Sequence, residues 1–215
     1  DPVSRERALI EALARRYSDD PKADADKLAR DYADAMRKLA ARYPDDADIA
    51  VLTAEAIMNA YPYDYWKPGG APQPWTPEIV ALLDRATRIA PDHPGAHHYR
   101  IHLYEASPTP AQALASADRI GTLAPSVGHL VHMPSHIYLR VGRYHDAVLA
   151  NAAAVESDRA YLAAVNANLQ ENISGIRVIQ TYAQEPFEQR HFEDLIRTYL
   201  RLGLRLVRYR ALFFA

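Results

Sequence analysis

Cysteine is absent from this 215-residue chain, and long hydrophobic runs are missing as well. Without cysteine the protein can form no disulfide, use no thiol in catalysis and bind no metal through thiolate, although imidazole and carboxylate ligands remain. No stretch approaches the 18 or more apolar residues of a membrane-spanning helix, and the N-terminal segment 1–3 has no apolar signal-peptide core. We therefore expect a soluble protein and leave its compartment open.

An excess of one charge is also lacking, since 25 basic and 27 acidic side chains give a net charge of −2. No part of residues 1–160 is basic enough for a nucleic-acid footprint, so we expect no nucleic-acid partner. Alternating runs of β-branched residues are scarce, whereas apolar residues three and four apart recur throughout the chain. This pattern predicts an all-α fold.

An internal repeat is the main positive feature of the sequence. Residues 91–154 match themselves with a shift of 34 residues, and seven of the nine histidines lie between His93 and His136. A fixed period of this size is typical of stacked helical hairpins. The equivalent positions are Ala90 and Ala124, Pro91 and Pro125, His98 and His132, His102 and His136, and Tyr104 and Tyr138.

The whole chain is expected to form an α-solenoid of about four helical hairpins, followed by a long C-terminal helical segment. Residues 61–76 interrupt this pattern with four prolines and five aromatic residues. Proline at that density excludes a regular helix, and the aromatic residues argue against an unstructured linker. We expect an ordered insertion, either a packed surface loop or a lid over a binding groove.

Several positions in the last repeat resemble the tetratricopeptide repeat (TPR) family, and Pro91 and Pro125 resemble its closing proline. The histidine-rich segments 94–102 and 128–138 resemble a bacterial subgroup of such repeat proteins. This resemblance covers about residues 5–162, and it implies a soluble repeat protein of the bacterial cytoplasm or periplasm that binds a peptide or protein partner. The signature positions are Tyr138, Gly142, Tyr144, Ala147 and Ala154.

The tail has a different character. Residues 165–180, followed by Glu185 and Phe192, resemble the membrane domain of an ABC exporter, and this resemblance covers about 165–215. A Gly-rich phosphate loop is missing, so we assign neither transport nor ATP hydrolysis. We divide the chain into a repeat domain, 1–160, and a helical extension, 161–215, which together indicate a possible chimera or engineered fusion without native activity.

A basic stripe with an apolar stripe is predicted on one helix of the tail. Such a helix can cap the solenoid, lie on an anionic membrane, occupy a partner's groove or mediate self-association. The basic stripe consists of Arg197, Arg201, Arg205 and Arg208, and the apolar stripe of Leu195, Tyr199, Leu202, Leu206 and Tyr209.

A concave groove lined by the first helices of successive hairpins is the candidate ligand site. Residues three and four apart share a helix face, which places one group of histidines on each of two neighbouring helices. The groove residues are predicted to be Glu55, Asn59, His98, His102, Glu105, His129, His132, His136 and Arg140.

Three interpretations of the histidines stay open. Imidazole pairs four residues apart suit Zn or another transition metal, with His98, His102, His132 and His136 as the predicted ligands. The same side chains can instead form a hydrogen-bonded polar seam, or they can recognise a peptide or anionic ligand.

The favoured function is a non-enzymatic repeat scaffold that binds a peptide segment or small ligand. The alternative is a metal-binding protein or metal-dependent hydrolase. No catalytic residue is predicted, because the sequence contains no nucleophile elbow, phosphate loop or cofactor fingerprint.

Overall fold

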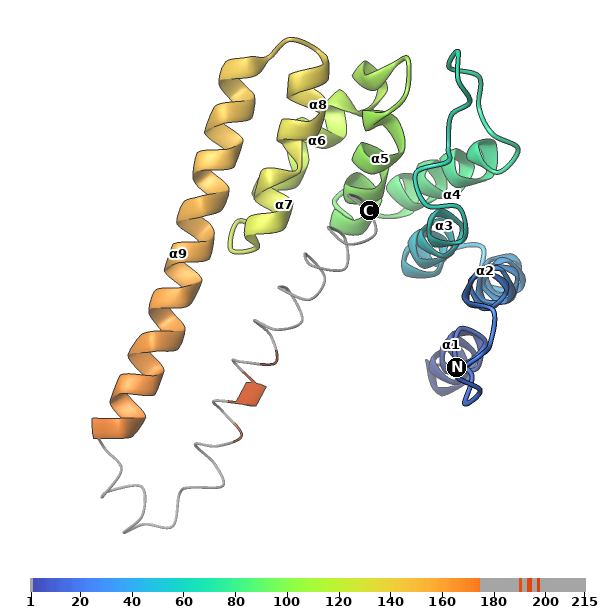
Figure 1. Ribbon diagram of the computed structural model, residues 1–215, viewed down its shortest axis with the longest axis horizontal. Coiled ribbons are helices and arrows are strands. Elements are labelled where there is room, and N and C mark those ends of the chain that lie inside the picture. The colour runs from blue at the N-terminus through green and yellow to red at the C-terminus, as the bar shows by residue number, and fades with distance from the viewer. Residues whose placement is uncertain (1, 175–189, 191–192, 195–196, 198–215) are drawn as a thin grey trace.

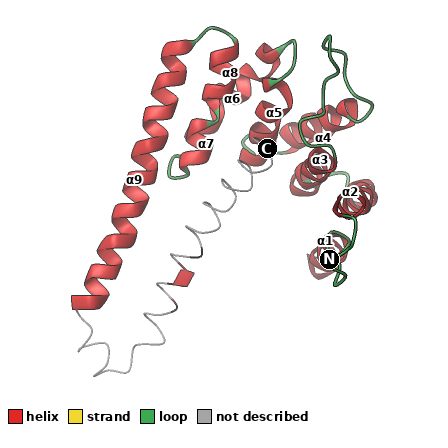
Figure 2. Cartoon of the chain, in the orientation of Figure 1, coloured by secondary structure: helices red, strands yellow, loops and turns green. Residues whose placement is uncertain are grey.

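The computed structural model describes residues 2–174, 190, 193–194 and 197. Across these residues the regular secondary structure is helical, with one isolated β-bridge between Trp66 and Pro72 (Figure 2). The prediction of an all-α fold is therefore confirmed.

Four antiparallel hairpins follow one another along the chain, and each packs on the next (Figure 1). A short 3-10 helix, η1 (Pro110–Ala113), precedes the second helix of the third hairpin. The hairpins are α1 (Pro2–Ala14) with α2 (Ala25–Arg42), α3 (Ala47–Ala60) with α4 (Thr76–Ile89), α5 (Pro94–Glu105) with α6 (Leu114–Leu123), and α7 (Gly128–His132) and α8 (Pro134–Arg140) with α9 (Tyr144–Ser174).

Side-chain caps fix where three of these helices begin. Asp24 accepts hydrogen bonds from the N–H groups of Asp26 and Lys27 at the start of α2, and Asp46 accepts one from Ile49 at the start of α3. His93 plays the same role before α5, where its ring nitrogen faces the N–H of Ala96. Each cap satisfies a backbone donor that the first turn of a helix leaves unpaired.

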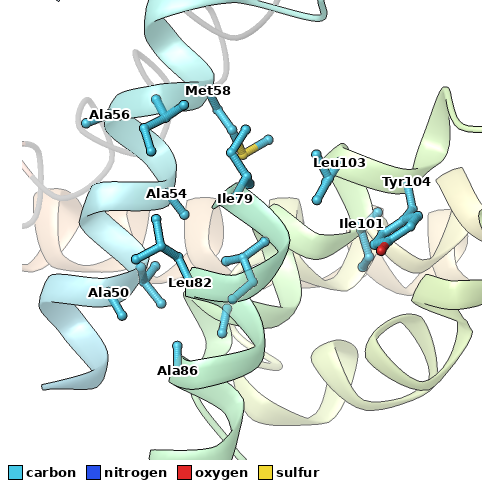
Figure 3. Close-up of a cluster of buried hydrophobic side chains, with 14 of the residues drawn as sticks. Ala50, Ala54, Ala56, Met58, Ile79, Leu82, Ala86, Ile101, Leu103 and Tyr104 are labelled. Carbon is cyan, nitrogen blue, oxygen red and sulfur yellow. The ribbon is translucent and has the colours of Figure 1, made fainter. Parts of the chain in front are cut away.

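The buried core runs from α1 to α9 and is rich in alanine, which allows the helices to approach closely. Figure 3 shows the part of it that α3, α4 and α5 form. Ile57 of α3, Ile79 of α4 and Ile101 of α5 are fully buried. The buried hydroxyl of Thr53 donates to the main-chain carbonyls of Met36 and Ile49, so its polar atom is compensated. Apolar burial between successive hairpins therefore holds the array together.

The insertion between α3 and α4 is ordered and packs against the third hairpin. Its Trp66 indole N–H donates to the carbonyl of Leu103 in α5 at 2.7 Å. Tyr61 and Trp75 stack with ring centroids 3.8 Å apart, which joins the two ends of the insertion. The insertion thus lies beside the C-terminal end of α5, the helix that carries His98 and His102.

Proline divides the first helix of the last hairpin into α7 and α8. Pro134 has no N–H to continue the helical hydrogen bonds, and the break falls at the buried Met133. His129 and His132 consequently lie on one segment and His136 on the next.

The second helix of that hairpin, α9, is 31 residues long and continues past residues 160 and 161, where the sequence places a domain boundary. Large apolar side chains are exposed along it, namely Tyr144, Val148, Leu149, Val155, Leu162 and Leu169. The division into two domains stays a prediction.

Candidate functional site: a cluster of five imidazoles

Five histidine side chains meet where the third hairpin packs against the fourth. His98 and His102 come from α5, His129 and His132 from α7, and His136 from α8. Residues three or four apart lie on one face of a helix, so the two histidines of α5 share a face, and so do the two of α7. The packing of α5 on α8 then brings both sets together.

Three of these rings, which we call the inner group, are those of His98, His102 and His129. The Nε2 atom of His98 lies 3.0 Å from Nε2 of His129 and 3.2 Å from Nε2 of His102. One ligand atom from each residue lies within 4.8 Å of the other two. His98 and His102 are 6% and 5% exposed, whereas His129 is half-buried, so two of the three rings of the inner group are shielded from solvent.

The other two rings, those of His132 and His136, form what we call the outer pair. Their Nε2 atoms are 3.0 Å apart. The side chain of His136 is 32% exposed, so this pair lies closer to solvent than the inner group. The Nδ1 atom of His132 lies 2.6 Å from the Oδ1 atom of Asn151 in α9, to which it donates.

Glu105, the last residue of α5, connects the two groups. Its Oε1 atom lies 2.9 Å from Nδ1 of His102, and its Oε2 atom lies 2.5 Å from Nδ1 of His136. A carboxylate only accepts hydrogen bonds, so both Nδ1 atoms carry the proton. Each ring, when neutral, therefore presents an unprotonated Nε2 atom to the cluster.

Burial and hydrogen bonding set the charge states of the cluster. Burial by itself would raise the pKa of Glu105, but the hydrogen bonds donated by His102 and His136 outweigh it and lower that pKa to about 2. Burial lowers the pKa of His129 to about 3, and the neighbouring histidines act in the same direction. Burial also lowers the pKa of His132. Near neutral pH, His129 and His132 are therefore uncharged and can act as metal ligands.

The remaining predicted groove residues have other surroundings. Glu55 accepts a hydrogen bond from Asn59 at 3.1 Å, and both lie on α3, whereas the imidazoles come from α5, α7 and α8. The guanidinium of Arg140 donates to the main-chain carbonyls of Glu105 and Ser107, where it stabilises the C-terminal end of α5. Arg140 thus acts on the backbone next to the cluster.

Asn151 takes part in the cluster although the sequence analysis did not single it out. It lies on α9, 19 residues after its partner His132, and no helical periodicity connects the two positions. A polar residue on an otherwise alanine-rich helix surface is the one signal that could have drawn attention to it.

Three of the other histidines serve the fold or face solvent. His93 caps α5 and approaches Asp48 at 3.0 Å. His97 is buried between Ser116 and the carbonyl of Pro91, and burial lowers its pKa. His145 is exposed. His191 lies outside the described residues.

Comparison with known proteins bears on two parts of the chain. The family model described as the ABC transporter transmembrane region matches residues 153–215, a stretch that starts within α9. A solved structure named MamA MSR-1 C2, a TPR-containing protein, is similar to this chain with 17% sequence identity and a TM-score of 0.47. The aligned region covers 72% of this chain and 94% of the MamA chain. No curated protein matches.

Beyond the end of α9 at Ser174, the tail is described at four positions, Arg190, Glu193, Asp194 and Arg197. Arg197 of the predicted basic stripe pairs with Glu193 at 3.3 Å. The rest of both predicted stripes lies outside the described residues. Among the described helices, none has the length and apolar character needed to cross a membrane.

Proposed function

We propose that this chain is a helical-repeat scaffold that binds a transition-metal ion between its third and fourth hairpins. The observation that carries the proposal is the convergence of the Nε2 atoms of His98, His102 and His129 in a shielded position. Sites built from imidazole suit Zn, Cu, Ni and Fe. The site would join two successive repeats, because its ligands come from α5 and α7.

The spacing of the nitrogen atoms supports this proposal. Imidazole nitrogens bind Zn²⁺ at about 2.0–2.1 Å, so two ligands on a tetrahedral ion lie about 3.3 Å apart. The separations of 3.0 Å and 3.2 Å around Nε2 of His98 are close to that value. All three ligand atoms lie within 4.8 Å of one another, so a small rearrangement of the rings would accommodate the ion.

The contact between Glu105 and His102 supports the proposal independently. Metal-binding histidines commonly donate their second N–H to a carboxylate, which fixes the ring and makes it a better ligand. Nδ1 of His102 makes this contact with Oε1 of Glu105 at 2.9 Å. Glu105 would therefore position a ligand and not bind the ion itself.

The proposal is tested by thermal unfolding of chelator-treated, tag-free protein with and without Zn²⁺, Ni²⁺ or Cu²⁺. Metal at about 100 times its dissociation constant adds about 2.7 kcal/mol to the free energy of unfolding, which corresponds to a rise in Tm of roughly 5–11 °C at this chain length. We expect His98→Ala combined with His129→Ala to abolish the rise.

The matched control is His145→Ala, which removes an exposed histidine outside the cluster. This variant should keep the full rise in Tm. If no metal raises the Tm of the wild-type protein, or if the rise survives loss of His98 and His129, the histidines form a polar seam and the proposal is wrong.

A second candidate function is binding of a peptide segment or small ligand beside the cluster, without any metal. The ordered insertion favours it, because Trp66 is fixed next to α5, where its ring lies 5.8 Å from that of Tyr104 and adds an aromatic surface to the third hairpin. Both tryptophans of the chain, Trp66 and Trp75, lie in this insertion, so their fluorescence reports on binding there. A peptide selected from a displayed library should change this fluorescence equally before and after chelation.

Two variants would examine that candidate. Trp66→Phe keeps an aromatic ring but loses the hydrogen bond to Leu103, and it should weaken binding of the selected peptide. Tyr17 is exposed and lies in the first hairpin, between α1 and α2, so Tyr17→Phe should leave peptide binding unchanged. Binding that disappears on chelation would instead favour the metal-dependent function.

A further inference from the structure

We propose that the cluster holds two metal ions, an inner one bound by His98, His102 and His129 and an outer one bound by His132 and His136. This inference rests on the proposed metal binding and specifies its stoichiometry. It also assigns a ligand class to the outer ion, an external carboxylate or other anion.

The internal repeat supports a second ion. His98 and His102 are related to His132 and His136 by the shift of 34 residues, and the members of each pair are four residues apart, within α5 in the first pair and across the break between α7 and α8 in the second. The Nε2 atoms are 3.2 Å apart in the first pair and 3.0 Å apart in the second. The geometry that brings two nitrogens to one point in the inner group therefore recurs in the outer pair.

The positions of the protons support it as well. Nδ1 of His136 donates to Glu105, and Nδ1 of His132 donates to Oδ1 of Asn151 at 2.6 Å. When both rings are neutral, each carries its one N–H at Nδ1, so both Nε2 atoms of the outer pair present a lone pair. Two lone pairs facing each other at 3.0 Å repel, and a bound cation removes this repulsion.

Glu105 positions one histidine ligand at each of the two proposed ion sites. One carboxylate oxygen holds His102 of the inner group, and the other holds His136 of the outer pair. Both rings are thereby turned so that Nε2, rather than Nδ1, faces the cluster. A single positioning residue thus prepares a ligand for each ion, although only the α5 repeat contains it.

The two sites differ in the number of coordination positions that the protein leaves unfilled. The inner ion would have three imidazole ligands in a shielded position, whereas the outer ion would have two imidazoles, one of them 32% exposed. A first-row ion with two protein ligands completes its coordination from solvent or from another molecule. The outer ion is therefore the one that an external ligand can reach.

Charge selects an anion for this role. Two divalent ions would bring four positive charges, while Glu105 contributes one negative charge to the cluster. The guanidinium of Arg140 adds a further positive charge where it donates to the main-chain carbonyl of Glu105. An anionic oxygen ligand, such as the carboxylate of a peptide side chain or C-terminus, offsets this excess.

The test is the zinc content of chelator-treated protein that has been reloaded with Zn²⁺ and passed through a desalting column. We expect two Zn²⁺ per chain in the wild type and in the His145→Ala control. The His132→Gln, His136→Gln double variant should retain one, and its circular dichroism should show that the helices are intact. A second measurement, a Co²⁺ titration of the wild type followed by absorbance, should show two phases.

Each outcome separates the two proposals. One Zn²⁺ in both the wild type and the double variant, with a single-phase Co²⁺ titration, would overturn the outer site and leave the proposed metal binding intact. No Zn²⁺ in any variant would overturn both. Acetate added to the Co²⁺ protein should alter the wild-type spectrum but not that of the double variant, and an unchanged wild-type spectrum would overturn the anionic ligand.

Discussion

At the scale of single residues, Glu105 determines which nitrogen atoms the cluster presents. It is 15% exposed, its side chain bonds two histidines from different hairpins, and its pKa is held at about 2, so it stays ionised across the physiological range. The histidines supply the nitrogen atoms, but this one carboxylate sets the tautomer of two of them. Its removal should consequently affect metal binding more than a surface carboxylate would.

Glu105→Gln is the substitution that tests this role. A glutamine side chain has one acceptor oxygen and one NH₂ donor, so it cannot accept from both Nδ1–H groups. One histidine must then move its proton to Nε2, which blocks that atom as a ligand. We expect the affinity for Zn²⁺ to fall roughly 10- to 100-fold, measured by competition calorimetry.

The control for this change is Glu156→Gln, which alters an exposed carboxylate paired with Arg159. It should leave the affinity unchanged. Equal affinities in the Glu105→Gln variant and the wild type would show that Glu105 does not position a metal ligand.

At the scale of elements, two aspartate caps can be compared directly. Asp24 caps α2 alone, whereas Asp46 caps α3 and also accepts hydrogen bonds from the guanidinium of Arg5, which joins α1 to α3. The Arg5 hydrogen bond is the main reason that the pKa of Asp46 is lowered. Asp46 therefore stabilises both a helix end and the packing of the first hairpin.

Replacing each cap by alanine separates these contributions. Asp24→Ala should cost about 1 kcal/mol of unfolding free energy, the usual effect of losing an N-cap. Asp46→Ala should cost about 1 kcal/mol more, because the ion pair with Arg5 is only partly exposed. Urea unfolding measures both values. Equal losses, or an additive Arg5→Ala, Asp46→Ala double variant, would mean that the ion pair contributes nothing.

At the scale of the whole molecule, buried histidines make the fold sensitive to acid. His97, His129 and His132 have pKa values lowered by burial, so the unfolded chain takes up protons that the folded chain excludes. The stability that these groups contribute is complete above their unfolded pKa of 6.5 and is lost as the pH falls below it, toward about 3 for His129. Glu105 adds a loss with the same sign between pH 4.5 and about 2.

We therefore expect Tm to fall continuously as the metal-free protein is taken from pH 7 to pH 4. Scanning calorimetry at constant ionic strength measures this change. His129→Gln should make the dependence shallower, whereas removal of the exposed His145 should leave it unchanged. A Tm that is constant or rises on acidification would contradict the assignment of neutral, buried imidazoles.

The sequence by itself determined the helical hairpins. The 34-residue repeat and the recurring apolar positions three and four apart act locally, so they predict an all-α fold of about four hairpins, with an insertion at residues 61–76. The sharing of one helix face by His98 and His102 also followed from helical periodicity alone. These features depend on neighbours in the chain.

Only the tertiary structure decided how the two sets of histidines combine. The predicted metal ligands omitted His129, and nothing in the sequence indicated that His129 meets His98 across the hairpin interface or that Asn151 holds His132. The packing of α5 on α8 and of α7 on α9 sets those contacts, and it depends on side chains distant in the chain. Local periodicity fixes the face on which a side chain lies, but only packing fixes the side chain that it meets.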